Sequence, residues 1–187
     1  MFRKLLPMVA LLLVAAAGFR SAGLALFTDA ATLDANSFVT ATVDISTNPA
    51  TALFNVTAMV PGDTVTQSLV VTNAGTAQLR YAVTASATNA DGLALKDQLA
   101  LVIKTLGTNC ATFDGGELYT GDLDSGVGGV IFGDTAQGAQ AGDRTLNAAA
   151  SETLCFRVSL PIGTGNGSQG AATTATYTFT AEQTANN

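Results

Sequence analysis

The sequence predicts an all-β protein, a two-sheet antiparallel β-sandwich that follows an N-terminal export signal. Three observations lead to this fold class. Apolar and polar residues alternate with a period of two over several short segments, as in half-buried strands. Turns that contain Gly or Pro separate these segments. Beyond the signal no stretch has helical periodicity, and strands at this spacing without helices are typical of a sandwich.

The N-terminus has the three-part layout of a secretory signal peptide. Arg3 and Lys4 precede the apolar run "LLPMVALLLVAAAGF", and the small residues Gly23 and Ala25 follow it. The run holds about a dozen strongly apolar residues, fewer than the roughly 20 that a membrane-spanning helix needs. We therefore expect cleavage between Ala25 and Leu26. The mature protein is expected to be secreted, at the cell surface or extracellular, and bound to the membrane only before cleavage.

The segment directly after the signal, residues 26–38, is predicted to be an N-terminal strand. Phe27, Ala31, Leu33 and Ala35 alternate with polar or small residues, so one face of this strand could be buried. Residues 39–187 are predicted to form the sandwich domain. Its expected strands lie at Val39–Ile45, Thr64–Thr72, Leu79–Ala87, Leu99–Thr105, Leu154–Leu160 and Thr174–Ala181.

Turn residues separate the expected strands. Pro61–Asp63 ("PGD") and Asn73–Thr76 ("NAGT") contain the Pro and Gly of tight reversals, and residues 161–170 are similar. Residues 114–142 are rich in Gly and have little alternation. We expect them to form a long surface excursion with one short strand near Val130–Phe132.

The two cysteines, Cys110 and Cys155, are expected to pair. Export places them in an oxidising compartment, where an even count favours a disulfide; two buried free thiols are the alternative. A bridge across a loop of this length restricts the unfolded chain by about 4 kcal/mol in the chain-entropy model.

Charge and residue types exclude several functions. Removal of residues 1–25 takes away three basic residues and no acid, which leaves 5 basic against 14 acidic residues and a net charge near −9. Nucleic acid and anionic lipid are therefore poor partners. The chain has no histidine, which removes the HExxH zinc site, the Ser-His-Asp triad and the Cys-His pair. We expect no catalytic residues, no metal and no cofactor.

Acidic side chains in the excursion are the remaining candidates for chemistry. Asp122 and Asp124 lie two residues apart and are a candidate catalytic carboxylate pair. Two acids this close in a Gly-rich loop are, however, more often solvated turn residues. Together with Asp114 and Glu117 they offer oxygen ligands for calcium, but their spacing fits no EF-hand loop.

Several motifs in order resemble the TasA/camelysin family of exported bacterial proteins, which are processed by SipW-type signal peptidases. Phe27–Asp29 follows the cleavage point, Pro61–Asp63 precedes a strand that ends in Thr72–Gly75, and the closing strand ends in Phe179–Gln183. The resemblance covers nearly the whole chain.

The resemblance implies two rival functions. TasA-like members are jelly-roll-like β-sandwiches that form fibres of the biofilm matrix, whereas camelysin-like members are classed as metallopeptidases. The missing histidine favours the fibre function. In TasA-like fibres the N-terminal strand acts as a donor strand, which implies the same role here for Phe27, Ala31, Leu33 and Ala35. The implied partners are further copies of this chain, joined head to tail, and a SipW-type peptidase during export. A monomeric surface-binding module is the other alternative.

Overall fold

A computed structural model describes residues 36–125 and 128–186. The chain divides into two units, one that ends at Val39 and one that runs from Thr40 to Asn187. Residues 36–39 of the first unit have no regular secondary structure. The expected cleavage site at Ala25 and Leu26 and the donor residues Phe27, Ala31, Leu33 and Ala35 lie outside the described residues.

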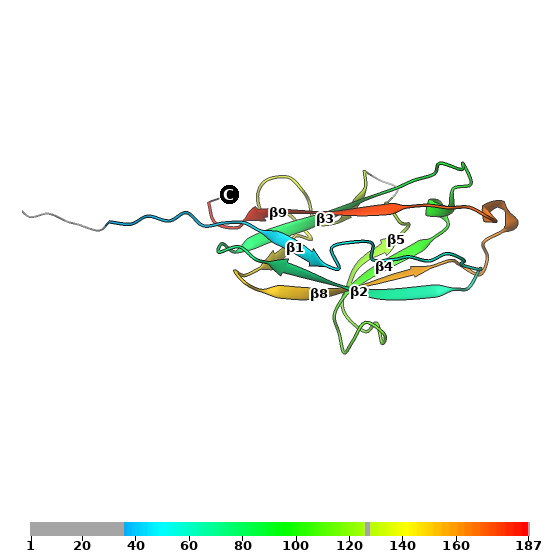
Figure 1. Cartoon of the computed structure of the whole chain (residues 1–187), viewed down its shortest axis with the longest axis horizontal. Helices are drawn as coiled ribbons and strands as arrows, with labels where there is room; N and C mark the ends of the chain where they lie inside the picture. Colours follow the sequence, from blue (N-terminus) through cyan, green and yellow to red (C-terminus); the bar gives the residue numbers. More distant parts are fainter. Residues whose placement is uncertain (1–35, 126–127, 187) are drawn as a thin grey trace, which may run out of the picture. The chain divides into compact units, whose positions relative to one another are not determined.

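The second unit is a β-sandwich of two antiparallel sheets (Figure 1). The larger sheet has the order β1-β2-β8-β4-β5, with all neighbours antiparallel. Its strands span Ile45–Asn48 (β1), Thr64–Asn73 (β2), Ser151–Ser159 (β8), Ala100–Thr105 (β4) and Glu117–Gly121 (β5).

The smaller sheet is built around β3 (Leu79–Ala87). β9 (Ala175–Gln183) pairs with one edge of β3 along its whole length, from Leu79 opposite Gln183 to Ala87 opposite Ala175. The short strands β6 (Val130–Phe132) and β7 (Arg144–Leu146) share the other edge. Two 3-10 turns, η3 (Leu95–Asp97) and η4 (Asn166–Ser168), lie in the connections. No helix among the described residues is long and apolar enough to cross a membrane.

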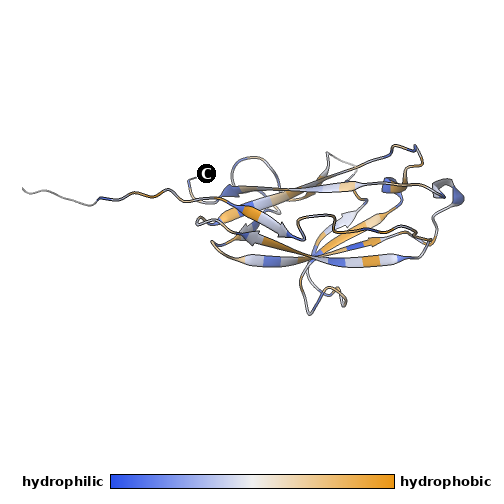
Figure 2. Cartoon of the chain, viewed as in Figure 1, coloured by the Kyte–Doolittle hydropathy of each residue, from blue (hydrophilic) through white to orange (hydrophobic). Residues whose placement is uncertain are grey.

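The core lies between the two sheets and comes from alternate residues of the long strands (Figure 2). Each large apolar side chain that is fully buried here contributes about 1.5–3 kcal/mol to folding. The fully buried members are Val71, Leu79, Tyr81, Val83, Leu101, Ile103, Leu154 and Phe156.

The strands expected from alternation are confirmed except the first. The strand expected at Val39–Ile45 begins only at Ile45, because the backbone before it bonds to a turn instead of a strand. The carbonyl oxygen of Thr42 accepts the N–H groups of Thr76 and Ala77, and that of Asp44 accepts the N–H of Ala74.

The prediction of one long excursion at residues 114–142 is wrong in part. The segment contains β6 as expected, but it also contains β5, which pairs with β4 at the edge of the larger sheet. β7 was missed as well. Both missed strands are short, with five and three residues, and such segments have too few alternations to reveal a strand.

The motif Asn73–Thr76 has a structural role at the end of β2. The Asn73 side chain is fully buried, and its Nδ2 lies 2.8–3.2 Å from the carbonyl oxygens of Ala77, Leu146 and Asn147. Its Oδ1 accepts the N–H of Gly75. A Cβ at Gly75 would collide with the carbonyl oxygen of Thr42, so only glycine fits there.

The disulfide expected between Cys110 and Cys155 is present, with a Cα–Cα distance of 5.1 Å. It fastens the loop between β4 and β5 to β8. In the same loop the Phe113 ring lies 3.7 Å from the Arg157 guanidinium, a cation-π contact. Hydrogen bonds from Thr108 and Thr112 lower the pKa of Asp114 to about 2.

Candidate functional site: an open strand edge beside an apolar groove

One long strand edge pairs with no second strand in the part of the chain that the structure describes. β9 pairs with β3 on one side, and no second strand pairs with it among residues 36–125 and 128–186. The remaining edge strands are shorter, with three to five residues against nine in β9. A long unpaired edge offers a row of backbone donors and acceptors to another chain.

The inward face of β9 is incompletely covered. Ala175, Tyr177, Phe179 and Ala181 pack against the core, yet each stays partly exposed, while the residues between them through Thr180 are exposed. On β3, the neighbouring strand of the same sheet, the inward residues Leu79, Tyr81 and Val83 are fully buried. Part of the apolar area of β9 therefore stays exposed in the described part of the chain.

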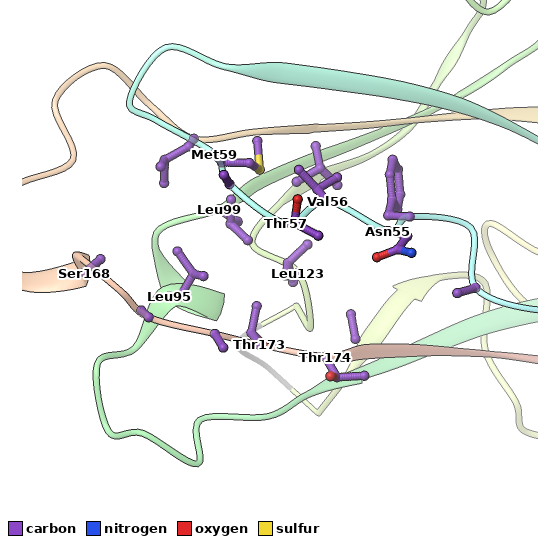
Figure 3. A pocket seen from close by; sticks show the side chains of 18 of the residues that line it. Asn55, Val56, Thr57, Met59, Leu95, Leu99, Leu123, Ser168, Thr173 and Thr174 are labelled. Carbon is purple, nitrogen blue, oxygen red and sulfur yellow. The ribbon is translucent and has the colours of Figure 1, made fainter.

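An open groove of about 800 Å³ lies beside this face. Figure 3 shows Val56 and Met59 on one side of it and Thr173 and Thr174 on the other, with Leu99 and Leu123 among the side chains between them. The first side is formed by residues 52–59, where Leu53, Phe54 and Met59 pack against the core although the segment forms no strand. The groove is therefore flanked by β9 and its preceding loop on one side and by an extended apolar segment on the other.

Tyr177 lies where β9 meets the groove. Its ring packs edge to face on Phe156 at 5.5 Å. Its hydroxyl is buried and has no hydrogen-bond partner among the described residues, and burial raises its pKa. A buried hydroxyl without a partner costs free energy, so a backbone carbonyl brought into the groove would gain a donor there.

Apolar side chains continue from the groove onto the surface. Val56 is 44% exposed, Val60 61% and Ile162 82%. Exposed apolar residues that adjoin a groove are typical of a binding surface rather than of a solvated loop.

The four acidic candidates do not come together in one group. Asp122 and Asp124 lie close to Asp97, with oxygens within 4.8 Å of one another. Asp114 instead binds the hydroxyls of its own loop, and Glu117 is an exposed residue of β5.

Two of the three clustered aspartates, Asp97 and Asp124, bind the side-chain ammonium of Lys96. Lys96 Nζ lies 2.9 Å from Asp97 Oδ1 and 3.0 Å from Asp124 Oδ2. These two hydrogen bonds raise the pKa of Lys96, so its ammonium stays charged. With an ammonium bound to two of its three carboxylates and no histidine in the chain, the cluster does not fit a catalytic metal centre.

Sequence reasoning found one part of this site and missed another. The strand Thr174–Ala181 was predicted, but its lack of a second partner could not be read from alternation. Residues 52–59 were not proposed as part of any site. The sequence feature that could have indicated this segment is the row of apolar residues Leu53, Val56 and Met59, which lie outside any expected strand just before the "PGD" turn.

Comparison with known proteins identifies the family. No curated protein matches the chain. Among solved structures the ASH/PapD-like domain 7 of human CEP192 is similar at 12% identity, over 85% of this chain and 96% of that domain, with a TM-score of 0.29; a score this low supports no conclusion about this chain. The family model described as camelysin metallo-endopeptidase matches residues 2–101, more than half of the chain. This chain therefore belongs to the camelysin family.

Proposed function

We propose that this protein is a secreted structural protein whose copies assemble into extracellular fibres of a biofilm matrix, without catalytic activity. Each copy supplies its N-terminal segment, residues 26–35, as a strand to the next copy. The observation that carries the proposal is the open edge of β9 beside an apolar groove. An extended segment added to such an edge gains backbone hydrogen bonds, and its alternate side chains enter the groove.

The lengths and patterns of the two partners agree. β9 has nine residues, and its inward face alternates with exposed threonines. The segment from Leu26 to Ala35 has ten residues, with Phe27, Ala31, Leu33 and Ala35 on one face, which also includes Asp29. Signal cleavage before Leu26 would free this segment, so a SipW-type peptidase would control the start of assembly.

Proteolysis is the competing function, and the family's name is its support. The proposal predicts that the purified mature protein cleaves casein no faster than buffer and that a chelator changes nothing. Cleavage that survives purification and is abolished by a chelator would overturn the noncatalytic part of the proposal.

Electron microscopy of two chains tests the assembly part. We expect filaments from the mature chain and none from a chain that lacks Leu26–Ala35. The shortened chain should keep its β-sheet circular dichroism and its melting temperature, because in this proposal the segment completes the next copy and not the core of its own domain. Normal filaments from the shortened chain would contradict the proposal. A shortened chain that unfolds would assign the segment to the core of its own domain.

A further inference from the structure

We infer that Arg157 and Lys104 form a binding site for an acidic sugar, whose carboxylate binds the Arg157 guanidinium. The site lies on the outer face of the larger sheet, the face that points away from the core. It uses neither β9 nor the groove, so it does not depend on the proposed assembly. Three observations support it: the two cations lack a carboxylate partner, their donors reach solvent, and hydroxyl groups adjoin them.

Two cations of this acidic chain form no ion pair in its described part. That part contains five basic residues. Three of them are ion-paired, Arg80 with Glu182, Lys96 with Asp97 and Asp124, and Arg144 with Glu152. The other two are Lys104 and Arg157. An anion from outside the chain can therefore bind there without displacing a carboxylate of the described residues.

The two cations are neighbours on one aromatic ring. Arg157 of β8 is opposite Val102 of β4, and Lys104 follows two residues later on the same face. The Arg157 guanidinium carbon lies 3.7 Å from the centre of the Phe113 ring, and Lys104 Nζ lies 5.0 Å from it. A ring attracts cations but carries no net charge. The positive charge of the pair is thus not neutralised by this contact.

Two acidic residues lie close by in sequence or register, but neither pairs with the cations. The carboxylate of Asp114, next to Phe113, accepts hydrogen bonds from two threonine hydroxyls and a backbone N–H of its own loop. Glu117 is opposite Lys104 in the register of β4 and β5. Lys104 Nζ instead donates to the carbonyl oxygen of Phe113. The site therefore keeps its positive charge.

Arg157 has an open pair of donors. Its Nε donates to Thr66 Oγ1 at 3.0 Å, which fixes the guanidinium in one orientation. Its two terminal nitrogens donate to none of the described residues, and they are not buried. Parallel N–H groups of a guanidinium match the two oxygens of a carboxylate. Because the Phe113 ring and Thr66 already hold the guanidinium, little side-chain freedom is lost when a carboxylate binds.

Hydroxyl groups adjoin Arg157 on the same face. Thr66 is opposite Arg157, and Ser159 is opposite Thr64, while Ser68 lies two residues farther along β2. Thr64 and Ser68 are exposed. β1 pairs only with the other end of β2, so this strip is open at its edge in the described part of the chain. A hydroxyl both donates and accepts hydrogen bonds, as the hydroxyls of a sugar do.

Charge limits the kind of anion that the site takes. The chain is strongly acidic, so it repels polyanions such as nucleic acid over its whole surface. A ligand with isolated carboxylates between neutral hydroxyl-rich units meets less repulsion and uses both the guanidinium and the hydroxyls. A uronic acid, free or in a polysaccharide with neutral sugars, has this chemistry.

Saturation-transfer NMR on the full mature chain tests the site, because it detects weak ligands on monomers and filaments alike. The probes are glucuronate, glucose, inorganic phosphate and a tetrasaccharide in which glucuronate alternates with a neutral sugar. The variants are Arg157→Gln combined with Lys104→Gln, and Arg157→Lys, which keeps the charge but not the paired donors. Lys96→Gln is the matched control, because it removes the same charge from a cation bound to two aspartates. Circular dichroism checks that each variant is folded.

We expect saturable binding of glucuronate, at least tenfold tighter than binding of glucose or phosphate. The double variant should weaken it at least tenfold and Arg157→Lys at least threefold, whereas Lys96→Gln should change it less than twofold. Tighter binding of the tetrasaccharide would assign the site to a polysaccharide, and equal binding to a free sugar. Equal affinity for phosphate, equal weakening by Lys96→Gln, or no saturation below ~50 mM glucuronate would overturn the inference.

Discussion

The two ends of β9 differ in how completely the chain itself covers them. At the Gln183 end, the buried Asn73 side chain contacts three carbonyl oxygens and one N–H, and Gln78 bonds to Asn147 and Thr184. At the Ala175 end, apolar side chains line an open groove, and Tyr177 has a buried hydroxyl without a partner among the described residues. One end is completed by its own turns, whereas at the other end an apolar groove stays open among the described residues.

A change at the closed end should have the largest effect on stability. Asn73→Ala leaves several buried backbone groups unpaired, each at a cost of about 1–3 kcal/mol. We expect a loss of about 3 kcal/mol in the free energy of unfolding, and a fall of roughly 10 °C in melting temperature for a domain of this size. Urea unfolding and calorimetry of the assembly-deficient chain without residues 26–35 measure both. A loss below 0.5 kcal/mol would show that Asn73 is not what holds this end together.

A change at the open end should leave stability nearly unaltered but stop assembly. Val56→Asp places a charge at the edge of the groove, where burial by an incoming strand would strip its water. Because Val56 is exposed, we expect the free energy of unfolding to change by less than about 0.5 kcal/mol. The concentration needed for filament formation should rise at least tenfold.

Val130→Asp is the matched control, because Val130 is 45% exposed against 44% for Val56 and lies on β6, away from the groove. Light scattering during assembly compares the two variants. Equal inhibition by both would indicate a general charge effect and would remove Val56 from the acceptor surface.

The smallest expected effect concerns Asp114, in the loop between β4 and β5 that the disulfide fastens to β8. Asp114 has a pKa of about 2 in the folded chain and ~3.9 when unfolded. Its contribution to stability is therefore fully present above pH ~4 and is lost as pH falls toward 2. NMR titration should show this low pKa, and it should move toward ~3.9 when Thr108 and Thr112 are both replaced by Val. An unchanged pKa in that double variant would refute the hydroxyl hydrogen bonds as its cause.

The predictability of the fold from sequence also differs between regions. Long strands such as β2 and β3 have enough alternating residues to be placed nearly to the residue, and the disulfide followed from export and an even cysteine count. β5 and β7 were missed because a short edge strand is defined by its partner rather than by its own pattern. The strand expected at Val39–Ile45 was placed too early, because hydrogen bonds from the turn at Ala74–Ala77 hold Thr42 and Asp44.

The candidate site was harder to predict, since its essential property is a missing neighbour. The alternation in "TATYTFTA" predicts a strand equally well in the middle or at the edge of a sheet. Likewise, Leu53, Val56 and Met59 resemble core residues until the fold shows that they line one side of a groove. The donor residues Phe27, Ala31, Leu33 and Ala35 remain a prediction.

Amide hydrogen exchange in assembled filaments tests the central claim most directly, because strand addition must protect β9 backbone amides that face away from β3. Mature filaments are compared with monomers of the chain without residues 26–35. We predict that exchange within Ala175–Ala181 slows at least tenfold on assembly, while the edge amides of β5 keep their monomer rates. Filaments in which β9 exchanges as fast as in the monomer would contradict strand addition at this edge.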